Sequence, residues 1–167
     1  MSKEYNISDI SFLVIDDCKH MRLIVRAMLS RFGVRKVIEA SDAIEALELL
    51  KTNSVDFVIV DQQMEPLDGH EFVRLVRTAG DSPNPFIPIV MLTAHTKRET
   101  VVQARDAGIT EFLGKPVCAK DLYLRIIETL DHPREFIRSS SYFGPDRRRS
   151  LGNNYKGPER RRSVFRI

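Results

Sequence analysis

The chain has 167 residues, of which 43% are hydrophobic, and this supplies enough apolar material for one domain with a buried core. Its two cysteines, Cys18 and Cys118, show no Cys-x-x-Cys spacing, which excludes a disulfide framework and a cysteine-based zinc site. No apolar run approaches the roughly 20 residues of a membrane span, and the first residues lack a signal-peptide core, so we expect a soluble, cytoplasmic protein.

The net charge of +3 is unevenly distributed along the chain. Residues 1–133 hold 16 lysines and arginines against 20 acidic residues, whereas residues 134–167 hold ten against three. An acidic body with a basic tail needs two separate explanations. We therefore expect a globular domain over residues 1–133 and a distinct tail over residues 134–167.

Short apolar runs alternate with amphipathic stretches throughout the expected domain. The runs lie at 12–15, 34–38, 57–60, 87–92 and 112–113, and they are rich in valine and isoleucine. Apolar residues at helical spacing lie between and after them, at 21–32, 43–50, 72–79, 97–107 and 123–130. Uninterrupted runs are typical of parallel strands buried on both faces, and strict alternation with helices favours a doubly wound sheet. The expected fold class is α/β, with a five-stranded, flavodoxin-like parallel sheet.

Polar side chains follow four of the five predicted strands. Asp16 and Asp17 follow the first strand, Asp61 the third, Thr93 the fourth and Lys115 the fifth. Because ligand sites of such sheets lie at the carboxyl ends of the strands, we expect these groups to converge. Clustered carboxylates repel one another, and Mg²⁺ relieves that repulsion because it prefers oxygen ligands. With a lysine and a hydroxyl nearby, the set favours phosphoryl chemistry, in which an aspartate can act as the nucleophile.

Taken singly, these residues have simpler interpretations. An aspartate pair before a helix commonly caps it, a Lys-Pro pair is commonly part of a loop, and a threonine commonly ends a strand. Their joint placement at the ends of different strands favours the functional interpretation.

With their neighbours, these residues resemble the receiver domain of two-component response regulators, the CheY-like proteins, over about residues 9–131. The resemblance rests on the acidic pair, on Asp61 followed by Met64-Glu65-Pro66-Leu67-Asp68-Gly69, on Ile89-Val90-Met91-Leu92-Thr93-Ala94, and on Phe112-Leu113-Gly114-Lys115-Pro116. It implies a phosphorelay protein that receives a phosphoryl group from a histidine kinase or a phosphotransfer protein, and chemotaxis is one pathway compatible with the resemblance. It also implies no enzymatic activity beyond the protein's own phosphorylation and dephosphorylation.

The resemblance assigns roles to the residues at the predicted site. Asp61 would be the phospho-acceptor, and Lys115 would contact the phosphoryl oxygens. Asp17, Asp61 and the backbone carbonyl of Gln63 would ligate Mg²⁺, while Asp16 would act mainly through a bound water.

The resemblance also implies a conformational switch. Thr93 would move to donate a hydrogen bond to the phosphoryl group, and Phe112 would rotate in response. The alternative for Phe112 is an ordinary core phenylalanine. The bond between Lys115 and Pro116 is expected to be cis, which costs little before proline.

The tail contains an internal repeat. Tyr142-Phe143-Gly144-Pro145-Asp146-Arg147-Arg148-Arg149-Ser150 nearly recurs as Tyr155-Lys156-Gly157-Pro158-Glu159-Arg160-Arg161-Arg162-Ser163. Little apolar mass and two Gly-Pro pairs predict a largely disordered tail.

Two clusters of arginines on a flexible tail favour binding to an anionic partner. The candidates are nucleic acid, an anionic membrane surface, an acidic protein or the acidic domain itself, and the alternative is a solvated tail without a partner. Two outputs therefore stay open. Either a separate protein reads the phosphorylated domain, or phosphorylation controls a polyanion-binding tail.

Overall fold

The computed structural model of the chain describes residues 5–94, 97–147 and 163–165. Five parallel strands form one sheet in the order β2-β1-β3-β4-β5. The strands are β1 (Ser11–Ile15), β2 (Lys36–Ala40), β3 (Phe57–Asp61), β4 (Ile89–Thr93) and β5 (Glu111–Gly114). The helices are α1 (Lys19–Arg31), α2 (Ala43–Thr52), α3 (Gly69–Thr78), α4 (Arg98–Ala107) and α5 (Ala119–Asp131). The predicted doubly wound, flavodoxin-like α/β fold is confirmed, and residues 5–131 are called the α/β body below.

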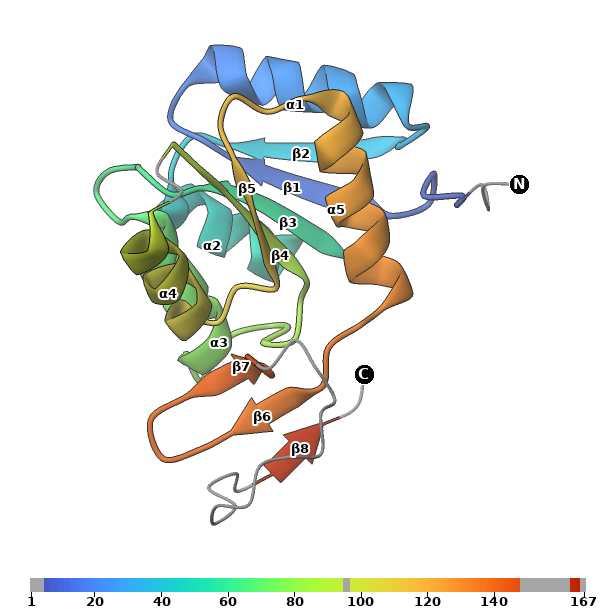
Figure 1. Cartoon of the computed structure of the whole chain (residues 1–167). Helices are drawn as coiled ribbons and strands as arrows, with labels where there is room; N and C mark the ends of the chain where they lie inside the picture. Colours follow the sequence, from blue (N-terminus) through green and yellow to red (C-terminus); the bar gives the residue numbers. More distant parts are fainter. Residues whose placement is uncertain (1–4, 95–96, 148–162, 166–167) are drawn as a thin grey trace.

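Both faces of the sheet are covered by helices, with α1 and α5 on one face and α2, α3 and α4 on the other (Figure 1). Successive strand residues point to opposite faces. Phe12 and Val14 of β1 therefore belong to the hydrophobic cluster under α1 and α5, whereas Leu13 and Ile15 belong to the cluster under α2 and α3. This double burial explains why the strands appear in the sequence as uninterrupted apolar runs.

Two strands begin later than their apolar runs predict. β2 begins at Lys36 rather than at Val34, and β4 begins at Ile89 rather than at Ile87. Proline has no N–H to donate, and Pro88 contributes only its carbonyl, which accepts a hydrogen bond from the Val58 N–H at 2.9 Å. β4 therefore begins directly after Pro88.

The chain beyond α5 forms a second, antiparallel sheet, called the tail sheet. It consists of β6 (Phe136–Arg138), β7 (Phe143–Pro145) and β8 (Ser163–Phe165) in the order β7-β6-β8. Figure 1 shows it below α3 and α4 and away from α1. The expectation of a largely disordered tail is therefore wrong for residues 134–147 and 163–165. The remaining tail residues lie outside the described ranges.

Aromatic packing attaches the tail sheet to the α/β body. The ring of Phe86, which precedes β4, lies 5.1 Å from the ring of Phe136, 5.4 Å from that of Phe143 and 5.6 Å from that of Phe165. Such aromatic pairs add to the stabilisation that burial provides. The prediction of disorder was based on the composition of the whole tail, in which arginines and serines outnumber these few aromatic residues. Composition cannot show that the aromatic residues share a core with Phe86.

Two basic residues strengthen this attachment. Arg134 is bonded to Glu111 at the start of β5, and the Arg147 guanidinium donates to Asp106 of α4 at 2.7 Å. Residue 133 therefore marks a change in composition, but side-chain contacts join the parts of the chain on either side of it.

Arg77 of α3 lies beneath the junction and is 3% exposed. Its Nε donates to the Gly108 carbonyl at 2.9 Å, and its Nη1 donates to the carbonyls of Pro85 and Ile87 at 2.7 and 2.8 Å. Its guanidinium carbon lies 5.0 Å from the centre of the Phe136 ring. Burial lowers the pKa of Arg77 to about 9, so the side chain remains charged at neutral pH. Neutral carbonyls, together with an aromatic face, compensate this buried charge.

Gly108, which caps α4 at φ 101°, has the left-handed conformation expected after a helix. A Cβ at this position would lie 3.2 Å from the Phe143 carbonyl oxygen, so the small residue also allows the tail to approach closely. None of the helices in the described ranges combines the length and apolar character needed to cross a membrane.

Candidate functional site

The carboxyl ends of four strands bring the predicted polar residues to one edge of the sheet. Asp61 ends β3, Thr93 ends β4, Asp16 directly follows β1, and Lys115 directly follows β5. In the parallel register Asp61 lies beside Leu92 of β4, and Thr93 lies beside Gly114 of β5. The predicted convergence is confirmed.

Three carboxylates form the centre of this edge. Oxygens of Asp16, Asp17 and Asp61 lie within 4.8 Å of one another, with Asp16 and Asp61 buried and Asp17 exposed. Burial raises the pKa of Asp61; the hydrogen bond from Lys115 opposes this shift, and the negative charge of Asp16 adds to it. Such crowded oxygen donors, with one face open to solvent through Asp17, fit a hard divalent cation that retains water ligands.

Lys115 contributes the positive charge opposite these carboxylates. Its Nζ lies 2.7 Å from Asp61 Oδ1 and 3.5 Å from Asp16 Oδ2. Burial lowers the pKa of Lys115, but the hydrogen bond and charge of Asp61, with those of Asp16, outweigh burial and raise it overall. The bond between Lys115 and Pro116 is cis, as expected.

Thr93 is held by a residue that the sequence interpretation missed. Its buried hydroxyl donates a hydrogen bond to Oε1 of Gln62, the residue immediately after Asp61. The Gln62 N–H donates to the Leu92 carbonyl at 2.9 Å, which extends the pairing of β3 with β4 by one residue. The sequence offered no signal for this contact, because the register that pairs Asp61 with Leu92, and so places Gln62 beside Thr93, is seen only in the structure.

Gly69 closes the loop that follows the acceptor strand. Its N–H donates to the Gln62 carbonyl at 2.9 Å, and a Cβ at this position would lie 2.4 Å from the Asp61 carbonyl oxygen. α3 begins here with a capping box, in which Asp68 accepts from the Glu71 N–H and Glu71 accepts from the Asp68 N–H. The helix start and the glycine together fix the backbone of Asp61.

Residues 12–127 match the family model of the response regulator receiver domain. The chain belongs to this family. It is 33% identical to the chemotaxis protein CheY-3 of Vibrio cholerae over 114 residues, which are 68% of this chain and 86% of that protein. It is 32% identical to the chemotaxis protein CheY of Pseudomonas aeruginosa, over 68% of this chain and 90% of that protein.

Solved structures show the same receiver fold. A putative response regulator from Chloroflexus aurantiacus superimposes with a TM-score of 0.68 at 26% identity, covering 74% of this chain and 98% of that one. The receiver domain of the sensor histidine kinase PA1611 from Pseudomonas aeruginosa, solved with a magnesium ion in its active-site cleft, gives a TM-score of 0.62 at 26% identity. That match covers 71% of this chain and 94% of the other.

Two predicted site residues of this receiver stand apart from the contacts above. Gln63, two residues after Asp61, is exposed, and its role as a carbonyl ligand stays a prediction. Phe112 of β5 is half-buried and packs against the hydrophobic cluster under α2 and α3. This position is compatible with either of its two interpretations, and rotation of the ring stays a prediction.

The six arginines of the repeat divide into one described residue and five others. Arg147 pairs with Asp106, and its guanidinium carbon lies 4.5 Å from the centre of the Tyr142 ring. Arg148, Arg149, Arg160, Arg161 and Arg162 lie outside the described residues. The first arginine of the repeat is thus bound to the receiver itself.

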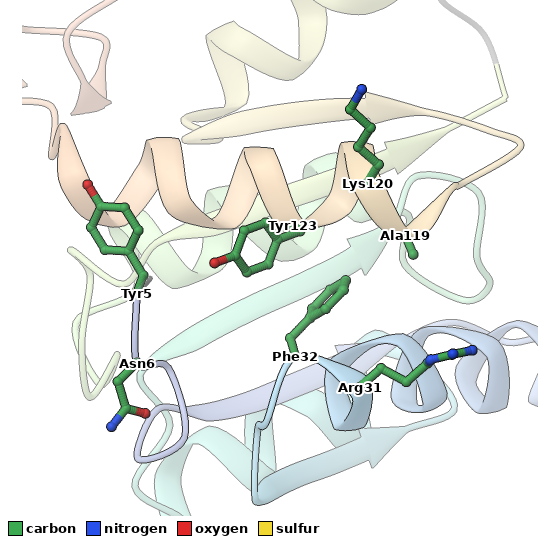
Figure 2. A pocket seen from close by; sticks show the side chains of 7 residues that line it. All are labelled: Tyr5, Asn6, Arg31, Phe32, Ala119, Lys120 and Tyr123. Carbon is green, nitrogen blue, oxygen red and sulfur yellow. The ribbon is translucent and has the colours of Figure 1, made fainter. Parts of the chain in front are cut away.

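An open cavity of about 640 Å³ lies apart from the acidic cluster, beside α1 and α5. It is lined by Tyr5, Asn6, Arg31, Phe32, Ala119, Lys120 and Tyr123 (Figure 2). The rings of Phe32 and Tyr123 meet edge to face with centres 5.1 Å apart. The cavity shares no residue with the predicted site.

Proposed function

We propose that this receiver accepts a phosphoryl group on Asp61, from a histidine kinase or a histidine phosphotransfer protein, in a Mg²⁺-dependent reaction. The observation that carries the proposal is the position of Asp61. It is 5% exposed, it lies in contact with Lys115, and it is within 4.8 Å of two further carboxylates. A carboxylate held this way is a positioned nucleophile with cationic stabilisation beside it.

In the transfer, a carboxylate oxygen of Asp61 attacks the phosphorus of the phosphohistidine donor. The new O–P bond forms as the N–P bond breaks, and the histidine nitrogen leaves with the bonding electron pair. Asp16, Asp17 and Asp61 would hold Mg²⁺, which when bound neutralises charge on the phosphoryl oxygens. Lys115 shifts its contact from the Asp61 carboxylate to a phosphoryl oxygen.

Thr93 supplies the link from phosphorylation to the protein surface. Its hydroxyl leaves Gln62 and donates to a phosphoryl oxygen, and Phe112 repacks near it. A separate protein then reads the face near α4, β5 and α5. The protein turns over no substrate besides its own phosphoryl group, and a cytoplasmic location is part of this proposal.

The test is phosphorylation of the full-length chain by a small-molecule phosphodonor with and without Mg²⁺. Asp61→Asn is expected to abolish the acid-labile phosphoprotein, because the amide is a poor nucleophile. Asp9→Asn is the matched control, because Asp9 is an exposed aspartate that pairs only weakly with Arg35, at 3.6 Å. Labelling that survives in Asp61→Asn, or that is unaffected by chelation of Mg²⁺, would refute the proposal.

A further inference from the structure

We propose that the tail sheet restrains the receiver switch by holding the end of α4 and the start of β5 in the positions they have before Asp61 is phosphorylated. The inference rests on the proposed function, because it concerns how readily the same acceptor site is activated. The family match ends at residue 127, before the tail sheet begins, so the receiver function by itself does not explain this part of the chain. Loosening the tail is expected to make the receiver easier to activate.

The first contact holds the carboxyl end of α4. Asp106, in the last turn of this helix, accepts a hydrogen bond from the Arg147 guanidinium at 2.7 Å. The guanidinium carbon of Arg147 also lies 4.5 Å from the centre of the buried Tyr142 ring, and the Tyr142 hydroxyl donates to the Pro145 carbonyl at 2.7 Å. The tail sheet therefore fixes the arginine that binds the helix.

The backbone of β7 packs closely against the cap of α4. A Cβ at Gly144 would lie 3.0 Å from the Gly108 Cα, and a Cβ at Gly108 would lie 3.2 Å from the Phe143 carbonyl oxygen. Arg77 joins the same contact, since its Nε donates to the Gly108 carbonyl at 2.9 Å and its guanidinium carbon lies 5.0 Å from the centre of the Phe136 ring. Close-packed interiors transmit displacement, so a shift at the end of α4 also requires a shift of β7.

The second contact holds the start of β5. Arg134, which precedes β6, is bonded to Glu111, the first residue of β5. The side chain of Glu111 is 6% exposed, and its second carboxylate oxygen lies 3.6 Å from Arg125 of α5. A buried carboxylate separates from its cationic partner only at a large cost. Because Phe112 directly follows Glu111, the tail restrains the backbone of the residue that is predicted to repack on activation.

The direction of the effect follows from the state in which these contacts are seen. The Thr93 hydroxyl is bonded to Gln62, and the Lys115 Nζ lies 2.7 Å from Asp61, which is the arrangement before transfer in the proposed mechanism. α4 begins at Arg98, five residues after Thr93, so movement of Thr93 displaces one end of a segment whose other end the tail holds. Contacts that favour one arrangement oppose the other. Activation must in turn weaken the tail contacts by the same factor, because coupling is reciprocal.

The experiment titrates the full-length chain with beryllofluoride, a mimic of the phosphoryl group on aspartate, in the presence of Mg²⁺ and follows binding by amide NMR. Arg147→Ala and Asp106→Ala remove the same half-exposed ion pair, so each should raise the beryllofluoride affinity about twofold. The double variant should gain no more than either single variant, because both changes remove one interaction. Arg35→Ala removes the exposed pair with Asp9 and should bind like the unchanged chain.

A further variant disturbs the backbone contact and leaves the ion-pair side chains unchanged. In Gly144→Ala the new Cβ would lie 2.6 Å from the Tyr142 hydroxyl oxygen and 3.0 Å from the Gly108 Cα, so β7 must move away from the cap of α4. The beryllofluoride affinity should then rise about fivefold. A thermal melt monitored by circular dichroism checks that each variant is folded. The ion-pair variants, which change half-exposed side chains, decide the question even where Gly144→Ala does not fold.

Hydrogen exchange of the unchanged chain tests the coupling from the other side. The Ser139 N–H donates to the Tyr142 carbonyl at 2.8 Å, and the Asp146 N–H donates to the Glu135 carbonyl at 2.7 Å, so both amides report on the pairing of β6 with β7. With Mg²⁺ and beryllofluoride bound, both should exchange about fivefold faster. The Asn53 N–H, which is hydrogen-bonded at the end of α2, is the reference amide and should keep its rate.

The outcomes separate this inference from the phospho-acceptor proposal. Equal or lower beryllofluoride affinity in the folded ion-pair variants would overturn the restraint, and so would tail amides that exchange no faster in the bound state. Either result, with normal binding by the unchanged chain, leaves the phospho-acceptor proposal standing. If the unchanged chain binds no beryllofluoride, or if Asp61→Asn binds it equally well, both proposals fall.

Discussion

Replacing Gly69 with alanine should damage the acceptor site more than its small volume suggests. The added Cβ would lie 2.4 Å from the Asp61 carbonyl oxygen and 3.0 Å from the Gln62 Cα, both of which are backbone atoms. Ordinary contact distances are about 3.5 Å, so the segment that carries Asp61 must move by about 1 Å. Such overpacking costs about 1–3 kcal/mol of unfolding free energy, and a 1 Å misplacement of a reacting group lowers a rate about 100-fold.

Gly80→Ala is the matched control, because a Cβ at Gly80 meets nothing within 4 Å. Urea unfolding followed by circular dichroism should show a loss of about 1–3 kcal/mol for Gly69→Ala. Gly80→Ala should be neutral or more stable by up to about 1 kcal/mol. Phosphorylation of Asp61 with Mg²⁺ should slow about 100-fold only in Gly69→Ala. If the two variants match in stability and phosphorylation rate, the close approach of Gly69 does not fix the acceptor loop.

Gln62→Leu removes the acceptor that holds the Thr93 hydroxyl in a hydrogen bond worth about 1 kcal/mol. Because Thr93 no longer has to give up this bond on activation, the affinity for beryllofluoride, measured by amide NMR, should rise about fivefold. Phe143→Ala should lower the free energy of unfolding by about 3–5 kcal/mol and make the tail sensitive to proteolysis, because this buried ring joins the two sheets. Burial raises the pKa of Tyr142 to about 12. The stabilisation of the fold by the neutral Tyr142 side chain is therefore complete below about pH 10 and is lost as the pH rises through about 12. Absorbance titration should show a tyrosine that ionises near pH 12, and Tyr142→Phe should remove that step.

Two of these predictions have a control that the chain supplies. Gln103→Leu changes an exposed glutamine of α4 that lies outside the predicted site and should leave beryllofluoride affinity unchanged. Val164→Ala alters an exposed apolar residue of the tail sheet and should cost far less stability than Phe143→Ala. Weaker beryllofluoride binding in Gln62→Leu, a protease-resistant tail in Phe143→Ala, or a late step that survives in Tyr142→Phe would each contradict its prediction.

Most of the α/β body could be predicted because its signals are local. Val58 and Ile59 lie in an uninterrupted apolar run since both faces of their strand are buried, and Gly108 marks the end of α4 because left-handed backbone suits glycine. The convergence of Asp16 and Lys115 followed from the topology of parallel sheets.

The features that were missed depend on contacts between distant segments. Phe136 looks like an isolated apolar residue in a basic tail until Phe86 and Arg77 are seen beside it. The contact between Gln62 and Thr93 depends on the direction of two side chains, which no periodicity encodes. The order of the tail and the hydrogen bond that restrains Thr93 therefore become visible only in the three-dimensional structure.

The buried guanidinium of Arg77 has a consequence for how the protein is made. A ribosome synthesises the α/β body before β6 and β7, so a nascent chain that ends at α5 has Arg77 and Phe86 in place but no Phe136 to cover them. Exposed apolar surface of this kind makes partly synthesised chains prone to association. The packing around Arg77 and Phe86 can therefore be completed only after β6 has been synthesised.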